Sequence, residues 1–195
     1  MNTFNLNTFS TAALAAAAFL VLASQPALAQ QKLDAAKSEM VFVSKQMGVP
    51  VEGKFRKFDA QVAFDPKKPE AGKVSFTIDT GSATFGSPET DAEVVKPTWL
   101  GVAKFPQATF QSSAIKAVGG GKFEVTGKLA IKGSTQNVVV PVALTQAGSA
   151  TTATGAFAIK RLEFKIGEGE WADTSMVAND VQVKFKLLLS GVPAL

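Results

Sequence analysis

A strict alternation of apolar and polar residues is the feature that most constrains this fold. Phe123, Val125, Leu129 and Ile131 alternate with charged or polar residues, and the pattern recurs over 73–79 and 181–189. A period of two is typical of β-strands with one buried and one solvated face. Such strands belong to an antiparallel sheet, so the alternation predicts an all-β fold.

Turn-forming residues divide the rest of the chain into segments of the same kind. Three consecutive glycines, residues 119–121, stand between two alternating runs and predict a hairpin. The expected strands cover residues 39–47, 54–65, 72–80, 107–118, 122–132, 137–146, 152–165 and 177–190.

Two of these strands change the parity of their apolar residues, between Phe55 and Phe58 and between Ile159 and Leu162. Each change predicts a β-bulge that bends the strand. Ser87, Pro88 and the acidic residues that follow predict one short helix near residues 88–97. We expect this segment to cap one end of the fold.

About eight strands with a single apolar face must hide that face, and closure into a barrel does so while removing exposed edges. We therefore expect an antiparallel β-barrel of about eight strands whose interior is either filled or holds one small ligand. A two-sheet sandwich would show the same alternation. The chain shows no internal repeat and no linker-like stretch, so residues 30–195 are expected to form one domain.

The N-terminal segment has the layout of a secretory signal peptide. An apolar run over residues 11–23 is followed by Ala27-Leu28-Ala29, which predicts export and cleavage after Ala29. The run is shorter than the roughly 20 apolar residues of a transmembrane helix. An uncleaved anchor helix is the alternative.

The composition argues against catalysis. The chain contains no Cys, His or Tyr, which removes disulfides, the commonest general base and the commonest metal ligand. Neither a Gly-x-Ser-x-Gly motif nor a phosphate-binding glycine loop is present. Glu168, Glu170 and Asp173 do not follow a calcium-loop spacing, and the net charge of +4 is spread along the chain. We therefore expect no catalytic residues, no cofactor, no metal and no nucleic-acid partner.

Four segments resemble one known family. They are residues 38–58, residues 64–66 with 74–80, residues 91–110, and residues 127–135 with 157–166 and 180–187. Together they resemble the YceI-like family of lipocalin-like, polyisoprenoid-binding proteins of the bacterial periplasm. The resemblance implies periplasmic location and an extended eight-stranded barrel with a long tunnel for an isoprenoid or fatty-acyl chain.

The chain departs from that family at two positions. Many members carry His where this chain has Gln46, and many carry Arg where it has Thr90. If that Arg contacts a polar head group in relatives, the contact is missing here.

Phe is frequent, at 15 residues, and many Phe lie on the expected apolar faces. They predict an apolar tunnel wall, which suits a preformed ligand site; a filled core is the alternative. The expected ligand-binding residues are Phe42, Met47, Phe58, Phe64, Phe76, Ile78, Trp99, Phe110, Phe123, Phe157 and Phe185.

Cations near the barrel mouth could hold a phosphate or carboxylate head group. The candidates are Lys45, Arg56 and Arg161; an outward salt bridge of Arg161 with Glu163 or Asp180 is the alternative for the last. The sequence thus favours a periplasmic carrier of an elongated amphipathic lipid, such as a polyisoprenoid, a quinone or a fatty-acyl compound. Transient contact with inner-membrane lipid or a membrane protein, as a monomer or homodimer, is expected of such a carrier. A filled barrel serving as a stress-response or protein-interaction module is the competing interpretation.

Overall fold

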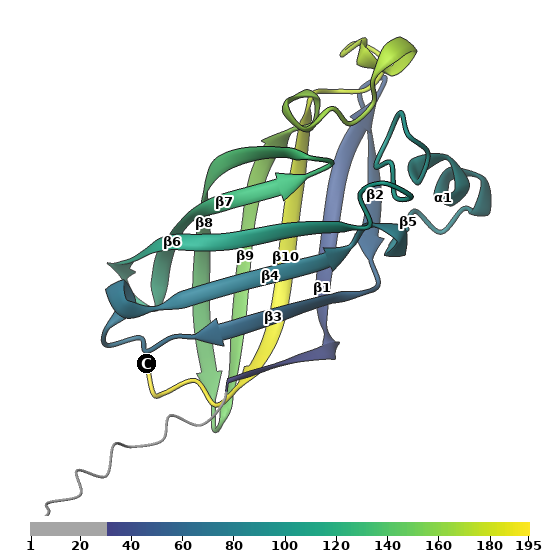
Figure 1. Ribbon diagram of the computed structural model, residues 1–195. Helices are drawn as coiled ribbons and strands as arrows, with labels where there is room; N and C mark the ends of the chain where they lie inside the picture. Colours follow the sequence, from purple (N-terminus) through teal and green to yellow (C-terminus); the bar gives the residue numbers. More distant parts are fainter. Residues whose placement is uncertain (1–30) are drawn as a thin grey trace, which may run out of the picture.

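The computed structural model describes residues 31–195, which form one strongly curled antiparallel sheet with a short helix at one end (Figure 1). The expected signal peptide, residues 1–29, lies outside the described residues. Among residues 31–195, no helix has the length and hydrophobicity needed to cross a membrane. The expected all-β, lipocalin-like class is confirmed.

The sheet contains ten strands in the order β3-β4-β6-β7-β8-β9-β10-β1-β2-β5. Their bounds are β1 Lys32–Gln46, β2 Val49–Phe55, β3 Phe58–Ala63, β4 Lys73–Asp79, β5 Ala83–Thr84, β6 Gln107–Gly119, β7 Lys122–Ile131, β8 Ser134–Ala147, β9 Ala150–Lys160 and β10 Asp180–Ser190. The helix, α1, spans Pro88–Val94.

The strand count differs from the expected eight for two reasons. The segment expected over residues 54–65 is interrupted at Arg56 and Lys57, which separates β2 from β3. β2 pairs with β1, whereas β3 pairs with β4, so the interruption carries the chain from one border of the sheet to the other. The two-residue strand β5, too short to show alternation, adds the tenth.

The bulge expected between Ile159 and Leu162 is wrong. β9 ends at Lys160, and a 3-10 helix, Arg161–Phe164, follows it directly. The Leu162 amide donates to the Asn179 side chain at 3.1 Å instead of to a strand partner. The parity changes there because the strand stops and the chain turns inward.

Most of the sheet is joined by tight hairpins, as the glycine signals predicted. Gly119, Gly120 and Gly121 all adopt positive φ angles between β6 and β7, a conformation that residues with a Cβ rarely reach. These hairpins keep β6 to β9 adjacent, and β10, which follows a longer connection, pairs with β9 to extend the wall.

The sheet closes on itself without a ladder. The edge strand β3 lies alongside β1, whose own ladders run to β10 and β2. Phe64, the residue after β3, is bonded by the side chain of Gln31, the residue before β1. Its amide nitrogen donates to the Phe64 carbonyl at 2.6 Å, and its amide oxygen accepts from the Phe64 N–H at 3.0 Å. One buried side chain therefore replaces backbone pairing where the curled sheet closes on itself.

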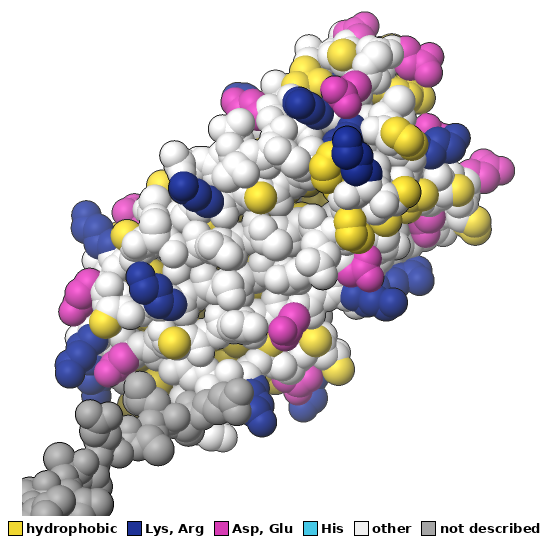
Figure 2. Space-filling view, viewed as in Figure 1, with side chains coloured by type: hydrophobic (Ala, Val, Ile, Leu, Met, Phe, Trp, Pro, Cys, Tyr) yellow, Lys and Arg dark blue, Asp and Glu magenta, His cyan; other side chains and the backbone are white. Residues whose placement is uncertain are grey.

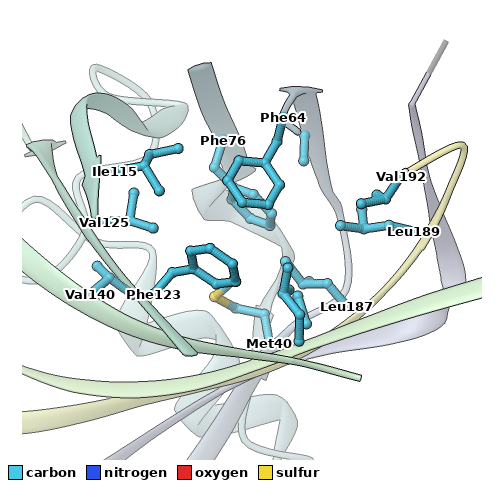
Figure 3. Close-up of a cluster of buried hydrophobic side chains, with 13 residues drawn as sticks. Met40, Phe64, Phe76, Ile115, Phe123, Val125, Val140, Leu187, Leu189 and Val192 are labelled. Atoms are coloured by element: carbon cyan, nitrogen blue, oxygen red, sulfur yellow. The ribbon is translucent and has the colours of Figure 1, made fainter. Parts of the chain in front are cut away.

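Apolar side chains from all the long strands point inward, and charged side chains are scattered over the outer surface (Figure 2). Figure 3 shows part of the inner cluster, where Phe64, Phe76 and Phe123 meet Met40 and Leu187 from the opposite wall. A second cluster, around Val94 and Leu100, packs α1 and the loop after it onto β5.

Candidate functional site: an apolar cavity

A cavity of about 540 Å³ runs through the interior of the curled sheet. Its wall is built almost entirely from aliphatic and aromatic side chains on the inward-facing positions of the strands. The period of two places these side chains on one face, and the curvature of the sheet turns that face inward.

The structure places most of the expected tunnel residues in this wall. Those that line the cavity are Phe42, Phe64, Phe76, Ile78, Trp99, Phe110, Phe123, Phe157 and Phe185. Met47 and Phe58 are not among the lining residues. These rings border the cavity, which favours a tunnel wall over a filled core.

Met47 lies outside because it belongs to a turn. It and Gly48 have positive φ angles, 47° and 82°, between β1 and β2, and the Met47 side chain is 72% exposed. The inward residues of β1 are Phe42, Ser44 and Gln46. Met47 breaks that parity, which is the signal that identifies it as an outward residue.

Phe58 has the correct parity but stacks on the Phe76 ring, at 5.6 Å between centroids. Phe76 lines the cavity and Phe58 supports it from β3. Its role is therefore to pack against a wall residue from the same inward face.

One end of the cavity is closed by buried side chains. Phe64 and Phe123 meet edge to face at 5.1 Å between centroids, beside Leu189 and Val192, as Figure 3 shows. All four side chains are less than 10% exposed. A long guest therefore cannot pass through this end.

The other end opens beside α1. Glu89, Thr90 and Glu93 of α1 line it, and Glu89 is exposed to solvent. Ser44 and Gln46 of β1 line the cavity as well. The two positions at which the chain departs from many YceI-like proteins, Gln46 and Thr90, thus both belong to the cavity wall.

Asp91 holds α1 in place at this opening. Its carboxylate accepts hydrogen bonds from the Thr84 hydroxyl and the Phe85 N–H, both at 2.6 Å. These two bonds, and the positive charge of Arg56, lower the pKa of Asp91 below its ordinary value. Sequence reasoning assigned Asp91 no role, although an acidic residue in the first turn of a helix suits the helix dipole.

Arg161 lines the cavity but has no donor left for a ligand. Its Nε donates to Ala178 at 3.1 Å, and its two terminal nitrogens donate to Ile166, Gly167, Trp171 and Val177 at 2.7–2.9 Å, in every case to backbone carbonyls. The side chain is 1% exposed, and burial lowers its pKa from the ordinary value. The alternative for Arg161, an outward salt bridge to Glu163 or Asp180, is wrong, because Arg161 is buried and bonds to carbonyls and Asp180 pairs with Lys160 at 2.7 Å.

Lys132 ties together two loops near the same end. Its ammonium donates to the carbonyls of Thr98 and Lys165, at 3.3 and 2.5 Å, and forms an ion pair with Glu168 at 3.0 Å. This contact sets Trp99 against Trp171, with ring centroids 5.4 Å apart, and both rings line the cavity.

The remaining cation candidates lie elsewhere. Lys45 and Arg56 are exposed, and neither lines the cavity. Arg56 donates to the Thr84 hydroxyl at 3.1 Å and so supports the Asp91 contacts. Within residues 31–195, no group of three or more acidic or other metal-ligating side chains converges.

One polar group in the cavity wall is unpaired. The indole N–H of Trp99 is buried and has no hydrogen-bond partner, unlike every other buried side-chain nitrogen or oxygen of the described chain. A buried donor without a partner carries a free-energy cost of about 1–3 kcal/mol, which a ligand oxygen would remove.

Comparison with known proteins places this architecture in a family. Residues 31–189 match the YceI-like domain. The chain belongs to the YceI-like family. A relative from Azotobacter vinelandii is 41% identical over 88 residues, which are 45% of this chain and 46% of the relative. The matched segment therefore spans about half the length of that relative.

Two solved structures resemble most of this chain. BcnA of Burkholderia cenocepacia is 49% identical, with a TM-score of 0.78 over 80% of this chain and 98% of its own. A polyisoprenoid binding domain from Saccharophagus degradans is 18% identical, with a TM-score of 0.67 over 84% of this chain and 99% of its own. The second likeness shows the fold alone.

Sequence reasoning missed several wall residues. Phe55 and Phe85 pack against Phe42, with ring centroids 5.1 and 5.2 Å apart, and line the cavity near its open end. Phe85 stands in an irregular segment with no alternation, so only its apolar character could have indicated it. Met40, by contrast, follows the parity of β1, and its apolar side chain lines the cavity as that parity indicates.

Proposed function

We propose that this protein is a periplasmic lipid-binding protein whose barrel holds the chain of one elongated amphipathic lipid. The cavity of about 540 Å³, apolar along its length and closed at one end, carries this proposal. A polyisoprenoid, a quinone or a fatty-acyl compound has the shape that such a cavity fits. A binding domain of the same fold is described as binding polyisoprenoid.

The energetics favour a hydrocarbon tail. Each buried methylene contributes about 0.8 kcal/mol, so a long tail binds well without specific hydrogen bonds. Few polar groups line the cavity between its closed end and the opening at α1. The tail enters first, and the head group remains beside α1.

The polar groups at the opening favour an uncharged head group. Glu89 and Glu93 bring negative charge there, and the guanidinium of Arg161 is fully used by carbonyls. The unpaired Trp99 N–H suits a carbonyl or hydroxyl oxygen. A quinone or a prenol meets these conditions better than a prenyl phosphate.

Export and binding without catalysis complete the proposal. The signal peptide is removed after Ala29, and residues 30–195 act as one domain in the periplasm. The chain supplies no His or Cys for acid–base or nucleophilic chemistry. The apolar ligand is exchanged with the inner membrane directly or through a membrane protein.

Native mass spectrometry of protein purified from periplasm without detergent tests this function. We expect a discrete added mass that organic solvent removes and that fragmentation identifies. Ala153→Phe places a ring in the cavity, because Ala153 lines it, and should abolish the added mass. Ala156→Phe, on the exposed face of the same strand, should retain it.

A mass that remains that of the unliganded chain after incubation with prenols, quinones and fatty acids would contradict the proposal. It would favour the protein-interaction module instead.

A further inference from the structure

Three inward-facing phenylalanines lie across glycines of the neighbouring strands. Phe42 pairs with Gly53 across β1 and β2, and Phe185 pairs with Gly155 across β10 and β9. Phe110 of β6 lies over Gly127 of β7. All three rings line the cavity.

A Cβ at any of these glycines would collide with the facing ring. At Gly155 it would lie 2.8 Å from Cε1 of Phe185. At Gly127 it would lie 2.5 Å from Cζ and 2.6 Å from Cε2 of Phe110. At Gly53 it would lie 2.7 Å from Cε2 of Phe42 and closer still to Cζ. Separations below 3.0 Å force something to move. The rings therefore occupy the space that a side chain would take on the adjacent strand.

We infer that these glycines set the calibre of the cavity, and that Gly53 is a specificity-determining residue at its open end. Without a Cβ, Gly53 lets the Phe42 ring lie flat against the wall. A ring displaced from Gly53 must turn toward the cavity or toward Phe55 and Phe85, which line the same end. This inference rests on the proposed function and identifies what determines the width of the lipid chain that can bind.

Gly53 gives the cleanest test of the three. Its φ angle lies outside the left-handed region, so alanine can adopt the same backbone. The nearest atoms to an added Cβ all belong to the Phe42 ring, whereas Gly127 and Gly155 also face backbone carbonyls. Gly53→Ala therefore perturbs the ring and leaves the strand pairing intact.

The experiment measures binding of geranylgeraniol, a branched chain, to Gly53→Ala by native mass spectrometry. We expect about tenfold weaker binding, which corresponds to losing the burial of about two methylene groups. Glu52→Ala, at the neighbouring exposed position of β2, should bind like the wild type. In the double variant Gly53→Ala/Phe42→Ala the clash is gone, and binding should recover toward the wild-type value.

Crystal structures of the wild type and Gly53→Ala give a result that needs no lipid. We expect the Phe42 ring to be rotated away from β2 in the variant, with a narrower cavity. Wild-type protein that binds no lipid, together with a rotated ring, would reject the proposed function and keep this inference.

Unchanged binding by Gly53→Ala, an unmoved ring, or a double variant as impaired as the single one would overturn it. If Gly53→Ala fails to fold, folding of the double variant supports the clash, and failure of both contradicts it.

Discussion

Arg161 is a buried cation whose side chain bonds to backbone carbonyls and to no carboxylate. Five N–H groups converge on five backbone carbonyls of the segment 166–178. The planar guanidinium is the side chain whose fixed donors suit such an arrangement. Arg161 therefore organises the loop that carries Trp171, and the ligand meets Trp171 instead of the cation.

Replacing Arg161 by Lys should be costly. An ammonium has three donors, so at least two of the buried carbonyls lose their partners, and we expect the free energy of unfolding to fall by about 2 kcal/mol or more. Urea denaturation of the unliganded protein measures the loss. The matched exposed variant, Arg56→Lys, should lose no more than about 1 kcal/mol. Equal losses would show that the carbonyl contacts add nothing.

The contrast between Phe42 and Arg161 explains how much of the site the sequence could predict. Phe42 follows a parity that is visible in the sequence, and the structure places it in the cavity wall. The partners of Arg161 are backbone carbonyls, and these have no sequence signature. Its role depends on how a loop folds around it, which alternation does not report.

At the scale of elements, the Asp91 carboxylate adds to the apolar contacts that hold α1 at the cavity opening. Because the folded state lowers the pKa of Asp91, this group contributes stability above its ordinary value of 3.8. That contribution is lost as the pH falls below 3.8 and through the folded-state pKa. Acid should therefore release α1 from β5.

NMR can follow this release through the Phe85 amide, which donates to Asp91. We expect the Phe85 proton resonance to titrate below pH 3.8 in the wild type. Asp91→Asn should show no such titration, because its amide keeps the same charge. A resonance that titrates equally in both proteins would assign the effect to another carboxyl group.

How well each strand or helix could be predicted from the sequence depends on its length. Long strands with hairpin glycines, such as β6 and β7, could be located because the apolar–polar alternation continues along their whole length. β5 and the 3-10 helix after β9 could not, because two to four residues cannot establish a period. Both short elements lie near the cavity opening, so local sequence was least informative where the ligand enters.

At the scale of the whole molecule, the barrel is hollow, and this should appear in its stability. Phe123 borders the cavity, whereas Phe164 is 1% exposed and is not part of the cavity wall. Truncating a ring in solid packing costs about 3–5 kcal/mol. We expect that loss for Phe164→Ala and a loss of about 1–3 kcal/mol for Phe123→Ala, where one side of the ring already lacks contacts.

Chemical denaturation of the unliganded variants measures these two losses of stability. Phe123→Ala should in addition bind lipids with longer chains, because the truncation lengthens the cavity at its closed end. A loss for Phe123→Ala as large as that for Phe164→Ala would indicate a filled interior. The sequence could not distinguish a hollow barrel from a filled one, because inward-facing Phe residues give the same alternation pattern in both.

The closure between β1 and β3 has a consequence for how this barrel receives its guests. In a ring of strands joined throughout by ladders, every neighbouring pair is held at about 4.8 Å and the circumference is fixed. Here the Gln31 amide on Phe64 fastens the edge strand β3 to the start of β1, and no ladder between β1 and β3 occurs within residues 31–195. We therefore expect a bulkier ligand to widen the barrel along the line between β1 and β3, while the other strand pairs keep their ladder spacing.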